Sequence, residues 1–282
     1  GKDFQYKYFT RAISLKLFGS VAYFLIYIYY YKGGDTVAYF SGANSYTDLF
    51  YTDISSFFKA YFGGANEDLM QLFNKNDIRM SEYYFYDAKA RFVIKFTTLF
   101  SIVTYKSYLL STLLMSSTLF YPLWRLFKSF NTLSLPILWN FVSIFLVPSL
   151  IFWSGGISKD ILMFSGTFLV ISLFIHYEGK KRFKFYILLF LGLFTIISVK
   201  AYVVIALFPS ILLWKSIDYL RVKVKNMYMR ALVLPFLLVA SIAIAFSFLN
   251  LLGDSMDKFA LDKALETANE TQLDLKRDYY EG

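Results

Sequence analysis

Four charged side chains that lie far apart in the sequence have the chemistry to handle a phosphate group and an attacking hydroxyl: Asp35, Lys159, Asp160 and Lys200. Asp35 follows the pair Gly33-Gly34, and paired glycines allow a tight turn with close backbone approach. A carboxylate in such a turn can accept a proton from a hydroxyl as a general base, or hold a cation. The alternative is structural: Gly-Gly-Asp ends one helix and Asp35 caps the next.

A second feature is the segment 153–160, with the sequence Trp-Ser-Gly-Gly-Ile-Ser-Lys-Asp. A turn rich in glycine and serine before a helix presents free backbone N–H groups, and Lys159 beside them would favour a bound phosphate. The alternative is a tight helical hairpin in which Ser158 caps the second helix and Asp160 favours its positive end. The spacing leaves both interpretations open.

The third feature is Lys200, which lies inside an apolar stretch and is followed by Tyr202. A lysine in such a stretch is costly, so it usually faces protein, water or a ligand. The alternative is that its ammonium group snorkels to the lipid headgroups. The single histidine, His176, and the tyrosine-rich run 27–31 fit residues at a membrane interface.

The composition indicates what kind of protein must position these residues. The chain contains 57% hydrophobic and 17% charged residues. Soluble domains average about 45–50% apolar and about 25% charged residues. The net charge of +9 is spread over the connections between apolar segments, so we expect no nucleic-acid partner. With no cysteine and one histidine, the chain can form neither a disulfide framework nor a metal site of several histidines.

Apolar segments long enough to cross a bilayer recur along the chain. A span needs roughly 20 apolar residues. The candidate spans are residues 13–31, 108–124, 133–153, 161–177, two within 183–214, and 231–252. The stretch 183–214 is broken near Lys200, so it could be two short spans or one long tilted helix. The basic residues on both sides of the stretch favour two spans. The expected fold is therefore all-α, a polytopic transmembrane bundle of about seven spans.

The basic residues predict the orientation of this bundle. Fifteen of the 29 Lys and Arg residues, but only three of the 20 acidic ones, lie in four segments that alternate along the predicted topology. These segments are residues 1–16, 125–132, 178–184 and 215–230. Because basic residues collect on the cytoplasmic side, we expect the N-terminus inside and the C-terminus outside.

Two long segments then fall on the outer side. Residues 32–107 form a large first loop within a transmembrane domain of residues 1–252, and its stretch 37–62 predicts one or two helices at the membrane surface. Residues 91–104 predict a re-entrant or interfacial helix. Residues 253–282 hold eight acidic and four basic residues and predict an amphipathic tail. This topology brings all four charged side chains to the outer boundary of the membrane.

Two motifs carry a resemblance to a known family: Gly33-Gly34-Asp35-Thr36-x-x-Tyr39, and the run from Pro148 through Trp-Ser-Gly-Gly-Ile-Ser-Lys to Asp160. With them the sequence resembles bacterial multi-spanning proteins of the GT-C glycosyltransferase type and, more loosely, O-antigen polymerase-like proteins. In GT-C enzymes an acidic residue follows the first span in an outer loop that also carries surface helices. The chain has a lone aspartate there and fewer spans than is common in that family.

The resemblance implies a membrane glycosyltransferase of the bacterial cytoplasmic (inner) membrane that uses a polyprenyl-phosphate-linked sugar. Asp35 would be the catalytic base or would hold a divalent cation. Tyr39, Lys159, Asp160, Lys200 and Tyr202 would bind substrate. Expected partners are membrane lipid, the lipid-linked sugar and other envelope membrane proteins.

Two other functions compete with this hypothesis. One is a non-enzymatic membrane subunit of an envelope secretion or translocation complex, and the other is a lipid-linked glycan transporter or polymerase. The absence of a repeated half argues against a transporter. The chain starts at Gly1 rather than at a methionine, so we expect a fragment or a processed form.

Overall fold

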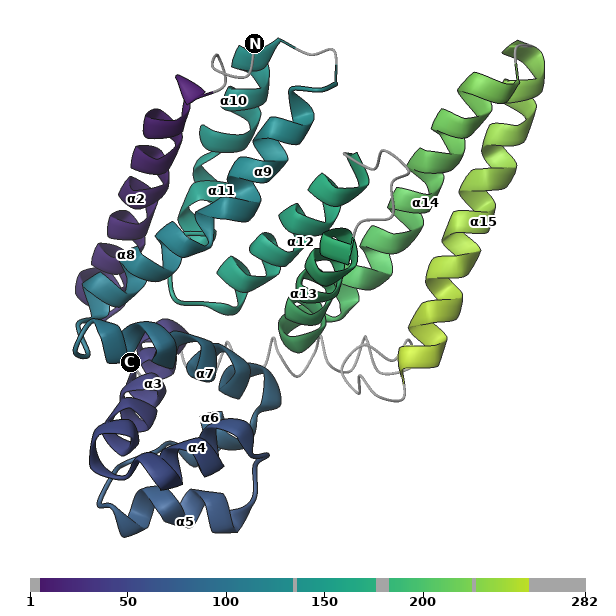
Figure 1. The fold of residues 1–282 in the computed structure, drawn as a ribbon. Coiled ribbons are helices and arrows are strands. Elements are labelled where there is room, and N and C mark those ends of the chain that lie inside the picture. Colours follow the sequence, from purple (N-terminus) through teal and green to yellow (C-terminus); the bar gives the residue numbers. More distant parts are fainter. Residues whose placement is uncertain (1–5, 134–135, 176–182, 225–226, 254–282) are drawn as a thin grey trace, which may run out of the picture. The chain divides into compact units, whose positions relative to one another are not determined.

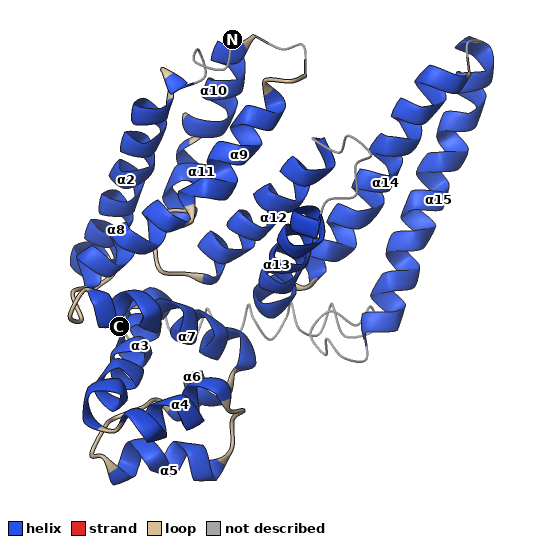
Figure 2. Cartoon of the chain, in the orientation of Figure 1, coloured by secondary structure: helices blue, strands red, loops and turns tan. Residues whose placement is uncertain are grey.

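The computed structural model describes residues 6–133, 136–175, 183–224 and 227–253. Within these ranges the secondary structure is helical, with no strand (Figure 2). The predicted all-α class is therefore confirmed. The predictions for His176 and for the acidic tail, apart from Gly253, concern residues outside the described ranges.

The chain divides into two compact units, Gly1–Ala201 and Tyr202–Gly282 (Figure 1). The first unit contains α2 (Phe9–Leu25), η1 (Ile26–Tyr30), α3 (Asp35–Thr52), α4 (Ile54–Phe62), α5 (Glu67–Lys75), α6 (Glu82–Tyr86), α7 (Ala88–Val103), α8 (Tyr108–Thr118), α9 (Phe120–Phe130), α10 (Ile137–Phe145), α11 (Pro148–Trp153), α12 (Lys159–Ile175) and α13 (Phe183–Lys200). The second unit contains α14 (Tyr202–Lys223) and α15 (Met227–Gly253), which pack together as a hairpin.

Among the residues that the structure describes, three helical segments are long and apolar enough to cross a membrane: Phe9–Tyr30, Phe183–Lys200 and Tyr202–Leu220. The break predicted near Lys200 is present, since α13 ends there and α14 begins at Tyr202. The predicted span 133–153 is divided into α10 and α11, because Pro148 requires an extended residue before it and Val147 has φ −82° and ψ 107°.

The region 32–107 folds into five helices, α3 to α7. The stretch 37–62 forms two helices that meet at Asp53, whose side chain accepts hydrogen bonds from the backbone N–H groups of Ser55 and Ser56, both at 3.1 Å. Asn66 caps α5 in the same way, accepting from Leu69 N at 3.0 Å. Polar caps thus set the helix boundaries in this region.

The region 32–107 shares its core with the apolar helices of the first unit. Helices α3 and α7 cross closely, since a Cβ on Gly42 would lie 2.8 Å from the side chain of Ile94. The same buried cluster continues into α8, α12 and α13 through Met115, Ile161 and Val199. The five helices are therefore packed onto the ends of the apolar helices, and they do not form a separate core.

Helices α12 and α13 cross closely at two glycines. A Cβ on Gly166 would lie 2.7 Å from the carbonyl oxygen of Gly192. Small residues permit such an approach between helices. This crossing fixes how the first turn of α12 lies against the last turn of α13.

The structure changes the interpretation of one basic residue. Lys16 was expected among the cytoplasmic charges, but it lies in the middle of Phe9–Tyr30 and is 2% exposed. Its ammonium group donates to the carbonyl oxygen of Ser154 and, at 2.7 Å, to the Ser154 hydroxyl. Basic residues near the start of a span normally reach the interface, and here a tertiary contact holds the side chain inside instead.

Candidate functional site

A distorted end to the first apolar helix positions Asp35. Helix α2 continues as the π-helix η1, and Gly33 N donates to the carbonyl oxygen of Tyr27 at 3.2 Å. Gly34 has φ +96°, a conformation that L side chains rarely adopt, and it lies against the Tyr27 ring. The glycine is needed here because a side chain would be strained in this backbone conformation. The chain reverses at this point, and Asp35 becomes the exposed first residue of α3.

Two tyrosine hydroxyls orient the Asp35 carboxylate. Tyr39, one turn along α3, donates to Oδ2 at 3.3 Å, and Tyr84 from α6 donates to Oδ1 at 3.1 Å. Burial, together with the neighbouring Asp35 charge, raises the pKa of Tyr39, and the same causes raise the pKa of Tyr84 to about 12. Both hydroxyls therefore remain protonated donors at neutral pH.

Lys159 joins this site through an ion pair. Its ammonium nitrogen lies 3.1 Å from Asp87 Oδ2 and 5.7 Å from the centroid of the Tyr39 ring. Asp87 also caps α7, since its Oδ1 accepts from Lys89 N at 2.8 Å. Burial would raise the pKa of Asp87, but the Lys89 N–H and the Lys159 ammonium outweigh it and lower that pKa.

A second ion pair continues the chain of charges. Lys200, the last residue of α13, lies 2.5 Å from Asp160 Oδ1, and each side chain is 25% exposed. Because Asp160 follows Lys159 directly, both pairs have one member in the first turn of α12. Tyr202 begins α14 and is described with the second unit, so its predicted role remains a prediction.

We call this set of residues the acid–lysine cluster. Its members are Asp35, Tyr39, Tyr84, Asp87, Lys159, Asp160 and Lys200. Tyr84 and Asp87 were missed by sequence reasoning. An aspartate just before a predicted helix is a capping signal that could have drawn attention to Asp87. Tyr84 stands in a run of aromatic residues and has no such signal.

The donor set does not fit a divalent cation. Within the described residues no group of three or more His, Cys, Asp or Glu side chains is placed to hold a metal ion. The oxygens of Asp35 accept from tyrosines, and Asp87 and Asp160 face lysines. Metal binding by Asp35 therefore finds no support in this geometry.

The glycine-rich turn before α12 is buried against α2. A Cβ on Gly156 would lie 2.0 Å from the Tyr23 ring, and one on Gly155 would lie 3.0 Å from the backbone of Gly19. Ser158 accepts from Ile161 N at 3.3 Å and so caps α12. The turn thus has a structural explanation, and only Lys159 and Asp160 of this segment reach the cluster.

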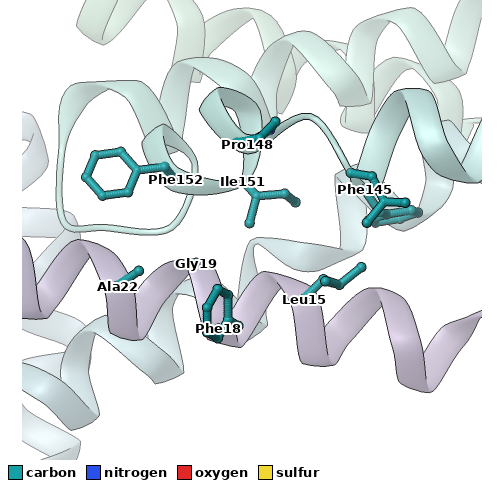
Figure 3. A pocket seen from close by; sticks show the side chains of 9 residues that line it. Leu15, Phe18, Gly19, Ala22, Phe145, Pro148, Ile151 and Phe152 are labelled. Carbon is teal, nitrogen blue, oxygen red and sulfur yellow. The ribbon is translucent and has the colours of Figure 1, made fainter.

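A groove of about 300 Å³ lies elsewhere on the first unit, between α2 and the consecutive helices α10 and α11 (Figure 3). Apolar side chains line it, among them Leu15, Phe18, Phe145 and Ile151. None of the residues that line it is ionisable. It offers no group that could take part in acid–base chemistry.

Comparison of the chain with protein-family models, with curated proteins and with solved structures found no match. The function must therefore be inferred from the acid–lysine cluster itself.

Proposed function

We propose that the chain is a membrane glycosyltransferase that moves a sugar from a lipid-phosphate donor to an acceptor hydroxyl. The observation that carries the proposal is the acid–lysine cluster, in which an exposed carboxylate held by two tyrosines lies near Lys159. Glycosyl transfer needs a base for the acceptor hydroxyl and positive charge for the departing phosphate. The cluster supplies both kinds of group.

In the proposed reaction, Asp35 accepts the proton of the acceptor hydroxyl while that oxygen bonds to the anomeric carbon of the sugar. The bond between the anomeric carbon and the phosphate oxygen breaks, and its electron pair leaves with the polyprenyl phosphate. Lys159 and Lys200 stabilise the negative charge on the departing group. Tyr39 and Tyr84 keep the carboxylate oriented through their hydrogen bonds.

We also propose the topology that this reaction requires. The chain would cross a bacterial cytoplasmic membrane about seven times, with its N-terminus inside and the cluster at the outer boundary. In support, three helical segments are long and apolar enough to span. Four further apolar segments follow the same order: α8 with α9, α10 with α11, α12, and α15. The distribution of Lys and Arg favours this orientation.

The absence of cysteine makes the topology simple to test. Gly64, which has open space around it, and Thr132, which is exposed, would each be replaced singly by cysteine. A membrane-impermeant maleimide added to intact cells should label Gly64→Cys, and should label Thr132→Cys only after the membrane is opened. The opposite pattern would overturn the orientation, and labelling of both in intact cells would overturn the span count.

The catalytic role is tested by Asp35→Asn. We expect transfer of a radiolabelled sugar from polyprenyl phosphate in proteoliposomes to fall by at least about 100-fold, because the base is lost while the shape is kept. The matched control is Asp77→Asn in the same region: Asp77 is exposed and has φ +56°, a conformation that asparagine tolerates well. Full transfer by a folded Asp35→Asn variant would disprove the role of Asp35. Stoichiometric membrane partners that co-purify with such a variant would instead favour a non-enzymatic subunit.

A further inference from the structure

The acid–lysine cluster carries more negative than positive charge. Its ionisable members at neutral pH are three carboxylates and two ammonium groups, which sum to one negative charge. Both lysines already have a carboxylate partner, at 3.1 Å for Lys159 and at 2.5 Å for Lys200. A phosphate-bearing ligand would therefore meet lysines that are already neutralised and, in addition, the Asp35 carboxylate. Such a ligand can bind well only if one of the ion pairs opens.

The pair between Lys159 and Asp87 has the features of a contact that can open. Asp87 uses Oδ2 for the lysine and Oδ1 for the Lys89 N–H, so its carboxylate keeps a hydrogen bond when the lysine leaves. The two side chains are 25% and 31% exposed, which gives both of them access to water. Exposed and partly exposed ion pairs contribute little net stability. Opening this contact leaves no buried charge without a partner.

Lys159 also has a surface along which to move. Its ammonium nitrogen lies over the Tyr39 ring, 5.7 Å from the ring centroid, and the hydroxyl of that tyrosine points to Asp35. The lysine side chain is a flexible four-carbon stem with a compact charge. A swing across the ring would bring the ammonium group from Asp87 toward the oxygen atoms that react in the proposed function.

We propose that the Lys159–Asp87 pair is an exchangeable latch. The phosphate of a lipid-linked ligand replaces Asp87 as the ion-pair partner of Lys159, and the Lys159–Asp87 pair forms again when the product phosphate leaves. This inference rests on the proposed function, because it takes the lipid phosphate as the ligand of the same site. It assigns Asp87 a role in tuning affinity and product release. Asp87 is a positioning residue here, since it acts on the ligand through Lys159.

The latch is tested by direct binding to the full chain in nanodiscs. The probe is farnesyl phosphate, and farnesol and inorganic phosphate serve as separate probes for the hydrocarbon chain and for the anion. We expect Asp87→Asn to bind farnesyl phosphate about tenfold more tightly, because a competing charge is removed. Asparagine still caps α7, so the fold should be kept. Asp77→Asn is the matched control and should leave the dissociation constant unchanged.

The double variant makes the test specific to Lys159. Lys159→Met should bind the probe at least tenfold more weakly, and Lys159→Met with Asp87→Asn should be equally weak. A gain in affinity that survives without Lys159 would overturn the latch, as would unchanged or weaker binding by Asp87→Asn. Failure of every variant to bind farnesyl phosphate would also overturn it. Tight binding of inorganic phosphate alone would assign the latch to a free anion.

The outcome for the latch is separable from that for the proposed function. If Asp35→Asn abolishes transfer while Asp87→Asn leaves binding unchanged, the latch is wrong and the glycosyltransferase proposal stands. If Asp87→Asn tightens binding but no variant or wild-type chain transfers sugar, the anion site stands and the catalytic proposal is wrong.

Discussion

Segment 153–160 involves two lysines in opposite surroundings: Lys16 contacts its first half, and Lys159 belongs to its second half. In the first half, Ser154 accepts hydrogen bonds from Lys16, which is 2% exposed and whose two partners are neutral oxygens. In the second half, Lys159 faces the carboxylate of Asp87, and the two side chains are 25% and 31% exposed, respectively. Only four residues separate Ser154 from the start of α12.

This difference shows that burial and the type of partner decide whether a lysine side chain can exchange its partner for a ligand. Removing Lys16 would leave two buried oxygen atoms without their donor, and buried polar groups without partners are strongly unfavourable. Lys159 can exchange its partner because water reaches both ends of the pair. We therefore interpret Lys16 as a structural link and Lys159 as a group available to a ligand. Three substitutions test this contrast.

The largest effect is expected where the buried half touches α2. Gly156→Leu would place a Cβ 2.0 Å from the Tyr23 ring, so the segment could not pack as it does. We expect the free energy of unfolding to fall by about 3 kcal/mol, with loss of folded protein after solubilisation. Thermal unfolding followed by intrinsic fluorescence would measure it. Gly64→Leu, whose Cβ would meet nothing within 4 Å, should behave like the wild type. A Gly156→Leu variant with wild-type Tm would refute the packing.

An intermediate effect is expected for the buried lysine. Lys16→Met keeps a similar volume but removes the donor to Ser154, and we expect a loss of about 2 kcal/mol of stability. The same fluorescence measurement applies. Lys89→Met is the control, because the Lys89 side chain is exposed and the substitution keeps the backbone N–H that donates to Asp87 Oδ1. A raised Tm in Lys16→Met would mean that the buried charge costs more than its hydrogen bonds return, contrary to a stabilising link.

The smallest effect on stability is expected in the charged half. Asp87→Asn should change the free energy of unfolding by about 1 kcal/mol or less. The pKa of Asp87 is lowered in the folded chain, so its stabilising contribution is present above the ordinary aspartate pKa of about 3.9. That contribution is lost as the pH falls through the lower folded pKa. The difference in Tm between wild type and Asp87→Asn should therefore shrink between pH 6 and pH 3. A difference that grew on acidification would contradict the ion pair.

The sequence allowed prediction of the residues whose charges are conspicuous. Asp35, Lys159, Asp160 and Lys200 stand out because a charge in or beside an apolar stretch is costly and has few explanations. The break at Lys200 could be predicted for the same reason, whereas the all-helical class could be predicted from the length of the recurring apolar segments. Patterns of hydropathy and charge are local, so they identify such positions without knowledge of the packing.

Contacts between distant parts of the chain could not be predicted. Lys16 was grouped with the cytoplasmic charges, since nothing nearby marks its bond to Ser154, 138 residues away. Tyr84 resembles Tyr83 and Tyr86 in type and setting, and only the packing of α6 beside α3 selects it for Asp35. The buried role of Gly155 and Gly156 likewise depends on the facing surface of α2.

The shared core also sets an order for biogenesis. Helices α3 to α7 are complete when residue 103 has been synthesised, but their buried cluster includes Met115, Ile161 and Val199. The region 32–107 therefore cannot finish burying its apolar surface until the ribosome has reached Val199. During that interval its aromatic side chains are available to chaperones and to aggregation. A destabilising substitution in α13 would thus first impair the packing of helices α3 to α7, which are synthesised long before it.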